Sequence, residues 1–160
     1  MALNLSDEVR IPATRDAVFA GLNNPDILRQ CIPGCEELVA LSEDELAAKV
    51  VLKIGPVKAR FAGKVTLDRT GAPATMTLTG EGQGGVAGFA KGSANVSLEE
   101  EGGETILRYE AQADVGGKIA QLGSRLIMGT AKKLAASFFN RFAAVMTGEA
   151  VAEAGEGEGE

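Results

Sequence analysis

The sequence predicts an α+β fold in which a curved antiparallel sheet of about seven strands wraps on one long C-terminal helix. Between residues 36 and 115, apolar and polar residues alternate with a period of two, and short turns interrupt them, which is typical of consecutive antiparallel strands. Residues 117–147 instead repeat apolar residues every three or four positions, as an amphipathic helix does. Proline and asparagine divide residues 12–33 into two short helical segments.

The first part of the chain predicts a strand followed by these two short helices. The strand ends before Pro12 and carries its large apolar residues on one face: Leu3, Leu5, Val9 and Ile11. Thr14 is suited to cap the first helix, which has a buried stripe of Val18, Phe19 and Leu22. Asn23 and Asn24 end that helix, and Pro25 suits the first position of a second helix that runs to Cys31.

Six further strands are predicted within residues 36–41, 46–54, 57–68, 75–84, 86–98 and 107–115. Turns of the expected composition join most of them, such as Gly55-Pro56 and Gly102-Gly103. Short connections between consecutive strands indicate an antiparallel meander that buries one face.

The last predicted element is a helix of about 30 residues within 117–147, which would be roughly 45 Å long. Its apolar stripe consists of Ile119, Leu122, Leu126, Leu134, Phe138, Phe142 and Val145. A sheet closed by such a helix is a helix-grip arrangement. We therefore expect one domain over residues 1–147, and an acidic disordered tail over residues 148–160, which lack apolar bulk.

The composition excludes much catalytic chemistry. The chain has no histidine, so the commonest general base and the commonest metal ligand are missing. Its two cysteines, Cys31 and Cys35, lie in CIPGC, a spacing that suits neither zinc nor a short disulfide, and we expect free buried thiols. We predict no catalytic residues, no metal site and no covalent cofactor, and hence a protein that is not an enzyme.

The charge distribution bears on partners and location. A net charge of −6 argues against nucleic-acid binding. The segment 117–147 is nevertheless purely basic, and Arg125, Lys132 and Lys133 are candidates for contact with a partner protein or an anionic membrane. The alternative is that they form the solvated outer face of a core helix. We expect a cytoplasmic protein, at most peripheral at the inner face of the cytoplasmic membrane, since no signal peptide or spanning segment is recognisable.

The stretch GEGQGGVAGFAKGSA at residues 80–94 contains the spacing G-x-G-x-x-G, which nucleotide-binding loops use. Such a loop needs a helix directly after the glycines, and the alternating residues that follow are not helical. Counting alternate positions instead puts small residues on the inward face of two neighbouring strands: Gly80, Gly82, Gly84, Val86, Gly88, Ala90, Gly92 and Ala94. The stretch therefore predicts an inward face with few large side chains.

Two interpretations of this face remain. Phe138 and Phe142 of the helix would fill the space and complete an ordinary core, or the space is a cavity for an apolar ligand. The glycine-rich face is longer than two aromatic rings, which favours the cavity. Tyr109 lies on the inward parity and would donate a hydrogen bond either to a ligand or to the backbone. The predicted cavity residues are Phe61, Met76, Leu78, Gly80, Gly82, Gly84, Gly88, Ala90, Gly92, Tyr109, Leu122, Leu126 and Phe138.

Four segments carry a resemblance to a known family: CIPGCEEL, GPVKARFAGKVTL, GEGQGGVAGFAKGSANVSLE and YEAQADVGGKIAQLGSRLI. Over about residues 2–146 the chain resembles the G-subunit family of carbon monoxide dehydrogenase, within the START-like helix-grip superfamily. The resemblance implies a START-like domain with a deep hydrophobic cavity. It also implies an accessory role beside a molybdenum hydroxylase of the carbon monoxide dehydrogenase type, with a quinone as ligand and a part in membrane recruitment or electron transfer.

We therefore expect a non-catalytic accessory protein that binds a hydrophobic small molecule, such as a quinone or another lipid, and docks on a molybdenum hydroxylase. One alternative is an assembly or recruitment protein with a filled core and no ligand. Another is a cyclase-like enzyme of the same fold, for which the chain lacks obvious acid–base groups.

Overall fold

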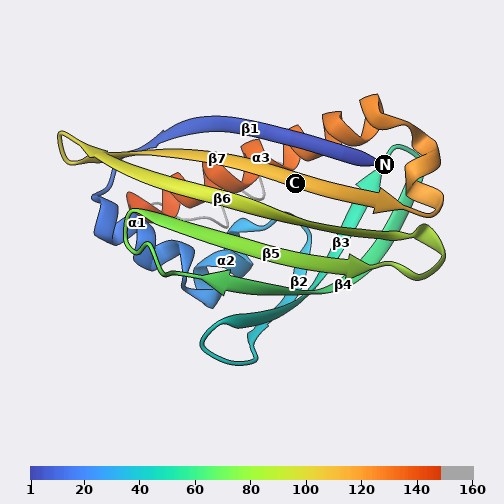
Figure 1. The fold of residues 1–160 in the computed structure, drawn as a ribbon, viewed down its shortest axis with the longest axis horizontal. Helices are drawn as coiled ribbons and strands as arrows, with labels where there is room; N and C mark the ends of the chain where they lie inside the picture. The colour runs from blue at the N-terminus through green and yellow to red at the C-terminus, as the bar shows by residue number, and fades with distance from the viewer. Residues whose placement is uncertain (149–160) are drawn as a thin grey trace.

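The computed structural model describes residues 1–148 and confirms the predicted fold class (Figure 1). Its seven strands form one antiparallel sheet in the order β1-β7-β6-β5-β4-β3-β2. The strands are β1 (Ala2–Ile11), β2 (Cys35–Ala40), β3 (Glu45–Ile54), β4 (Val57–Asp68), β5 (Thr75–Gln83), β6 (Phe89–Glu101) and β7 (Glu104–Gly116). The helices are α1 (Arg15–Leu22), α2 (Pro25–Cys31) and α3 (Ser124–Met146), with short 3-10 turns η1 (Gly85–Ala87) and η2 (Lys118–Leu122). The predicted acidic tail, residues 148–160, lies outside the described residues except for Gly148.

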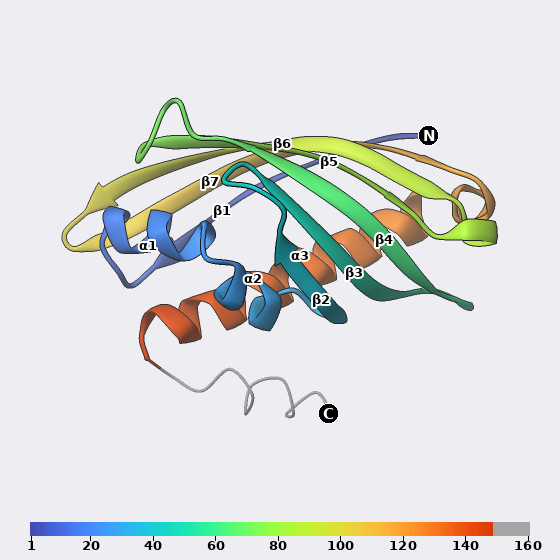
Figure 2. The same ribbon diagram turned by 90° about the horizontal axis from the view of Figure 1, so that it is seen from below.

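The sheet curves around α3, as Figure 2 shows, and α1 and α2 lie at the end of the sheet where α3 finishes. Helix α2 packs against β2 and α3, and α3 runs along the concave face. The interior of the domain therefore lies between the sheet and α3.

Local sequence signals place the two short helices as predicted. The Thr14 hydroxyl accepts a hydrogen bond from the Ala17 N–H (3.3 Å) and caps α1. The Asn24 side chain accepts from the N–H groups of Asp26 and Ile27, and Pro25 occupies the first turn of α2. These caps fix where the chain leaves the sheet and returns to it.

The prediction of a single C-terminal helix of about 30 residues was wrong in length. Residues 118–122 form the 3-10 turn η2, and α3 has 23 residues, roughly 35 Å. Gly117 (φ +83°) and Gly123 (φ +95°) flank η2 in a conformation that an α-helix cannot contain. The apolar spacing of three and four continued through this break, which is why periodicity alone missed it.

The predicted alternation through residues 84–88 was also wrong. Strand β5 ends at Gln83 and β6 begins at Phe89, so Gly84, Val86 and Gly88 belong to the connection between them rather than to an inward face. Gly88 has φ +119°, and the Val86 side chain is 92% exposed. Within residues 80–94, Gly84, Gly85 and Gly88 therefore lie in the connection, whereas Gly80, Gly82 and Gly92 lie in the strands.

The interior has a filled half on the side of α1 and α2. Here Phe142 is fully buried and stacks on Phe138 (ring centroids 5.9 Å apart), whose edge meets Phe139 at 5.0 Å. Tyr109 stacks on Phe139 at 5.4 Å. Buried residues from the strands and short helices complete this packing: Ile11, Val18, Leu22, Cys31, Met76, Leu98 and Leu107.

Candidate functional site

Two adjacent rows of small residues cross the concave face of the sheet. Hydrogen-bonded register aligns Ala48, Gly63, Gly82, Ala90 and Val115 from β3 to β7. The next row consists of Leu46, Val65, Gly80, Gly92, Ala113 and Leu3, and reaches β1. Since adjacent strands place glycine opposite glycine at the centre of both rows, the middle of the sheet presents backbone rather than side chains to the interior.

Apart from Leu46, the residues of these rows form the floor of an apolar cavity of about 480 Å³, a volume within the range of small-molecule sites. The sheet contributes Leu3, Ala48, Val50, Leu52, Ile54, Phe61, Gly63, Val65, Gly80, Gly82, Ala90, Gly92, Ala113 and Val115. Ile32 follows α2, and Ile119, Ile127, Thr130, Ala131 and Leu134 lie on η2 and α3. Three charged residues, Lys64, Glu81 and Lys91, also border the cavity. Their side chains are exposed and lie on the outer face of the sheet, since they alternate with the inward-facing residues.

Helix α3 contributes two short side chains to the cavity wall, beside the larger Ile127 and Leu134. Thr130 and Ala131 lie over the cavity, whereas the three phenylalanines of α3 begin two turns later and pack in the filled half. The Thr130 hydroxyl donates to the Leu126 carbonyl (3.2 Å). The interpretation in which Phe138 and Phe142 fill the space is therefore wrong for this half of the domain.

The four floor glycines differ in what a side chain would meet. A Cβ at Gly82 would lie 3.7 Å from the Ala62 carbonyl oxygen, an ordinary contact, so the space beyond it is open. A Cβ at Gly80 would lie 3.0 Å from the Lys64 carbonyl oxygen. At Gly63 and Gly92 a Cβ would overlap backbone of the neighbouring strand. Glycine is thus required for close strand approach at Gly63 and Gly92, and for open volume at Gly82.

Five of the predicted cavity residues lie on the cavity wall, namely Phe61, Gly80, Gly82, Ala90 and Gly92. The other eight lie elsewhere. Gly84 and Gly88 are in the β5–β6 connection, and a Cβ at Gly84 would lie 2.6 Å from the Phe61 ring. Met76, Leu78, Tyr109 and Phe138 belong to the filled half.

The last two predicted cavity residues lie near η2. Leu122 packs beside the buried cluster that borders the cavity, and Leu126 is 39% exposed against the β3–β4 turn at Gly55. Two wall residues that were not predicted show what the sequence could reveal. Gly63 alternates with the inward-facing residues of β4, so the alternation that identified Gly80 and Gly82 also identifies it. Ala131 could not be identified in this way, because a short side chain in a helix indicates a cavity only when the strand facing it is known.

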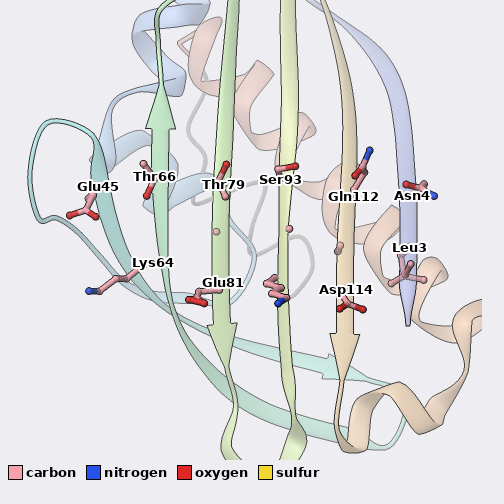
Figure 3. Close-up of a pocket in the computed structure, with 15 residues that line it drawn as sticks. Leu3, Asn4, Glu45, Lys64, Thr66, Thr79, Glu81, Ser93, Gln112 and Asp114 are labelled. Carbon is pink, nitrogen blue, oxygen red and sulfur yellow. The ribbon is translucent and has the colours of Figure 1, made fainter.

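The outer face of the same sheet carries a larger hollow, of about 660 Å³, which is bordered mostly by polar and charged residues (Figure 3). Register aligns the polar side chains of Glu45, Thr66, Thr79, Ser93, Gln112 and Asn4 in one row. In the next row Lys64, Glu81, Lys91 and Asp114 alternate in charge. Figure 3 shows the labelled side chains of these two rows on the face away from the helices. Exposed polar groups that alternate in charge are typical of a solvated sheet face, so the smaller inner cavity is the better candidate.

The chemistry available inside the cavity is apolar. Its wall side chains are aliphatic or aromatic apart from the Thr130 hydroxyl. No group of three or more carboxylate or cysteine side chains within residues 1–148 is arranged to hold a metal ion. The cavity is thus suited to shelter a hydrophobic ligand.

Both cysteines are free, as predicted, but only Cys31 is buried, in the filled half. The prediction that both thiols are buried was wrong for Cys35, which is partly exposed. Burial raises the pKa of the Cys31 thiol to about 11, and the positive charge of Arg141 opposes that shift. Burial also raises the pKa of the Cys35 thiol. At neutral pH both thiols are protonated, the form that is poorly nucleophilic.

The Cys31 pKa predicts a loss of stability in alkali. Between pH 9, its ordinary pKa, and about pH 11, the unfolded thiol releases its proton while the folded thiol keeps it. The free energy of unfolding should fall over that interval, by roughly 2–3 kcal/mol from this group. Cys35 and Tyr109, whose pKa values burial also raises, act in the same direction. Urea unfolding of the parent and of Cys31→Ala at several pH values measures how much of this loss is due to Cys31. If the free energy of unfolding falls equally with pH in the two proteins, Cys31 is not its source.

Within the described residues, no helix is both long enough and apolar enough to cross a membrane.

Comparison with known families gives one match over most of the chain. A family model that describes the G subunit of carbon monoxide dehydrogenase (CoxG) matches residues 8–147. No curated protein matches the chain.

Several solved structures are similar. A conserved protein from Geobacillus kaustophilus is 30% identical, with a TM-score of 0.85 over 91% of this chain and 95% of that one. A START superfamily protein from Mycobacterium smegmatis is 14% identical, with a TM-score of 0.66 over 89% and 98% of the two chains. The Zhui aromatase/cyclase from Streptomyces sp. R1128 is 10% identical, with a TM-score of 0.68 over 92% and 94%. The last two similarities show a shared fold alone.

Proposed function

We propose a function from one premise: the chain belongs to the G-subunit family of carbon monoxide dehydrogenase (CoxG), whose model matches residues 8–147. The family and the START-like fold support a ligand-binding accessory protein in general. The finer proposal is that this protein takes an isoprenoid quinone into its apolar cavity beside a molybdenum hydroxylase of the carbon monoxide dehydrogenase type. It would help to place that enzyme at the membrane or to pass on its electrons.

The observation that supports the proposal is the apolar cavity between the two aligned glycine rows of the sheet and helix α3. A bulky side chain at Gly82 would enter the cavity, because a Cβ there makes only ordinary contacts and the space beyond it is open. A long apolar ligand would recover the hydrophobic stabilisation that this half lacks, about 25 cal/mol per Å² of apolar surface removed from water. Because a quinone combines an isoprenoid chain with a redox ring, it suits both the cavity and an oxidoreductase partner.

The non-catalytic part of the proposal rests on the side chains at the cavity. General acid–base catalysis needs a titratable group within hydrogen-bond reach of the ligand. The charged residues that border the cavity, Lys64, Glu81 and Lys91, direct exposed side chains to the outer face. We therefore assign the cavity to binding.

The test is quinone binding with decylubiquinone, a short-chain quinone, measured by native mass spectrometry and equilibrium dialysis. We expect the parent protein to bind one equivalent, and Gly82→Leu to bind at least about tenfold more weakly, since its side chain enters the cavity. Gly129→Leu is the matched control, because Gly129 lies on the exposed surface of α3 with nothing within 4 Å of a Cβ. Equal binding by the Gly82 variant and the parent would place the ligand elsewhere, and no binding by the parent would overturn the quinone proposal.

A further inference from the structure

Three connections meet at one end of the domain, where η1, η2 and the beginning of α3 lie (right-hand side of Figures 1 and 2). They are the β3–β4 turn, the β5–β6 connection and the β7–α3 connection. The Leu126 side chain contacts the turn at Gly55, since a Cβ there would lie 2.7 Å from Leu126 Cδ2. Gly117, which precedes η2, packs closely on Gly88, which follows η1. The three segments thus form one continuous surface.

This end exposes apolar side chains. Val86, on η1, is 92% exposed, far more than any other large apolar residue of the described chain. Phe89 is 40% exposed and Leu126 is 39% exposed. Exposed apolar side chains that stand beside basic residues combine the two attractions that hold a protein at an anionic lipid interface, namely apolar burial and opposite charge.

The same end is positively charged although the whole chain carries −6. Residues 50–59, 84–90 and 115–128 contain four basic residues, Lys53, Lys58, Lys118 and Arg125, and no aspartate or glutamate. All four are exposed, and none forms an ion pair within residues 1–148. The neighbouring carboxylate of β7, Asp114, is paired with the N-terminal amine at 3.1 Å. We call Val86, Phe89, Leu126 and these four basic residues the basic tip.

The basic tip continues into the cavity wall. Ala87, adjacent to the exposed Val86, is 4% exposed and packs in one buried cluster with Ile54, Phe61 and Ile119. These three residues line the cavity. This buried cluster therefore connects the segment that carries Val86 to the wall of the proposed ligand site.

We infer that the basic tip is the surface through which this domain meets an anionic lipid bilayer, with Val86 inserted among the acyl chains. The inference rests on the proposed function, because it makes the bilayer the source of the apolar ligand. Each Lys or Arg near an anionic leaflet contributes about 1 kcal/mol. A bilayer fits better than an acidic protein surface, since Val86 protrudes singly and a lipid surface demands no shape complementarity, whereas a stable protein interface needs a well-packed patch.

The absence of tryptophan in the chain permits a direct test. Val86→Trp places a single fluorophore on the tip, and Leu41→Trp places one on a different exposed apolar residue (49% exposed) as a matched control. With vesicles of phosphatidylcholine and about 30 mol% phosphatidylglycerol, we expect a blue shift and quenching by brominated lipids for the Val86→Trp variant only. Unchanged emission of the Val86→Trp variant would overturn the inference, as would equal quenching of both probes.

Charge reversal tests the basic part of the tip. Lys118→Glu/Arg125→Glu should weaken vesicle sedimentation at least about tenfold. Lys132→Glu/Lys133→Glu, farther along α3, should leave it within about twofold of the parent. If the Lys132/Lys133 variant alone loses vesicle binding, the α3 face is the lipid surface and the inference is wrong. If the tip variants bind vesicles normally but lose the molybdenum hydroxylase, the tip is a protein interface and the inference is equally wrong.

Decylubiquinone binding separates this inference from the proposed function. Val86→Asp should keep the quinone affinity of the parent in detergent-free solution and lose vesicle binding. If the parent binds vesicles through the tip but binds no quinone, the proposed ligand fails and the lipid surface stands. If it binds quinone but no vesicles, the lipid surface fails and the proposed ligand stands.

Discussion

Phe142→Ala is expected to lower the free energy of unfolding by about 3–5 kcal/mol, the usual cost of removing a fully buried phenylalanine. The Phe142 ring has no exposed surface and stacks on Phe138. On its other side it lies against α1, since a Cβ at Gly21 would meet the Phe142 ring at 3.1 Å. The resulting hole would lie where α1, α3 and the sheet converge, and rigid elements on all sides would keep it from collapsing.

Urea unfolding followed by far-UV circular dichroism measures this loss. Phe142→Leu is the control, and it should cost markedly less, because it keeps most of the apolar volume. A loss below about 1 kcal/mol for Phe142→Ala would mean that the filled half of the interior can repack, contrary to the close packing seen around this ring.

Gly92→Ala is expected to destabilise the domain by about 1–3 kcal/mol although it adds one methyl group. Gly92 lies in β6 opposite Ala113 of β7, and its new Cβ would overlap the carbonyl oxygen of Gln112. Because that oxygen belongs to backbone in a central strand pair, it cannot move without disturbing the sheet.

Gly82→Ala provides the matched comparison from the neighbouring row. Its Cβ would make only ordinary contacts, and alanine is favoured over glycine in a strand by about 0.5–1 kcal/mol. Thermal and urea unfolding should therefore show opposite signs for the two glycine-to-alanine changes. Two changes of the same sign would refute the distinction drawn between a glycine kept for strand approach and one kept for volume.

Most of the fold could be predicted from patterns among residues that are close in sequence. The caps at Thr14 and Asn24 involve groups within three residues of each other, so the sequence predicts them directly. The alternation in β4 and β7 likewise reports which side of each strand is buried. The errors came where backbone conformation changes without a change in apolar spacing, at Gly85, Gly88 and Gly123.

The candidate site was predictable only in part, because alternation gives the face of a residue and not its place along the sheet. Leu78 and Gly80 share a face two residues apart, yet Leu78 packs in the filled half and Gly80 lies on the cavity floor. What separates them is the alignment of Gly80 with Gly92 across β5 and β6. Register between strands depends on contacts distant in sequence, and no local pattern contains it.

The division of the interior has a consequence for redesign. Functional sites are often kept at a cost in stability, so that changes which stabilise a protein tend to weaken its function. Here the aromatic half around Phe142 supports the fold, whereas Gly82 lies on the cavity wall with room for a side chain. Substitutions at Gly82 should therefore reduce the volume of the cavity, and with it the size of the ligand that fits, without the overlap with backbone that a side chain at Gly63 or Gly92 would cause.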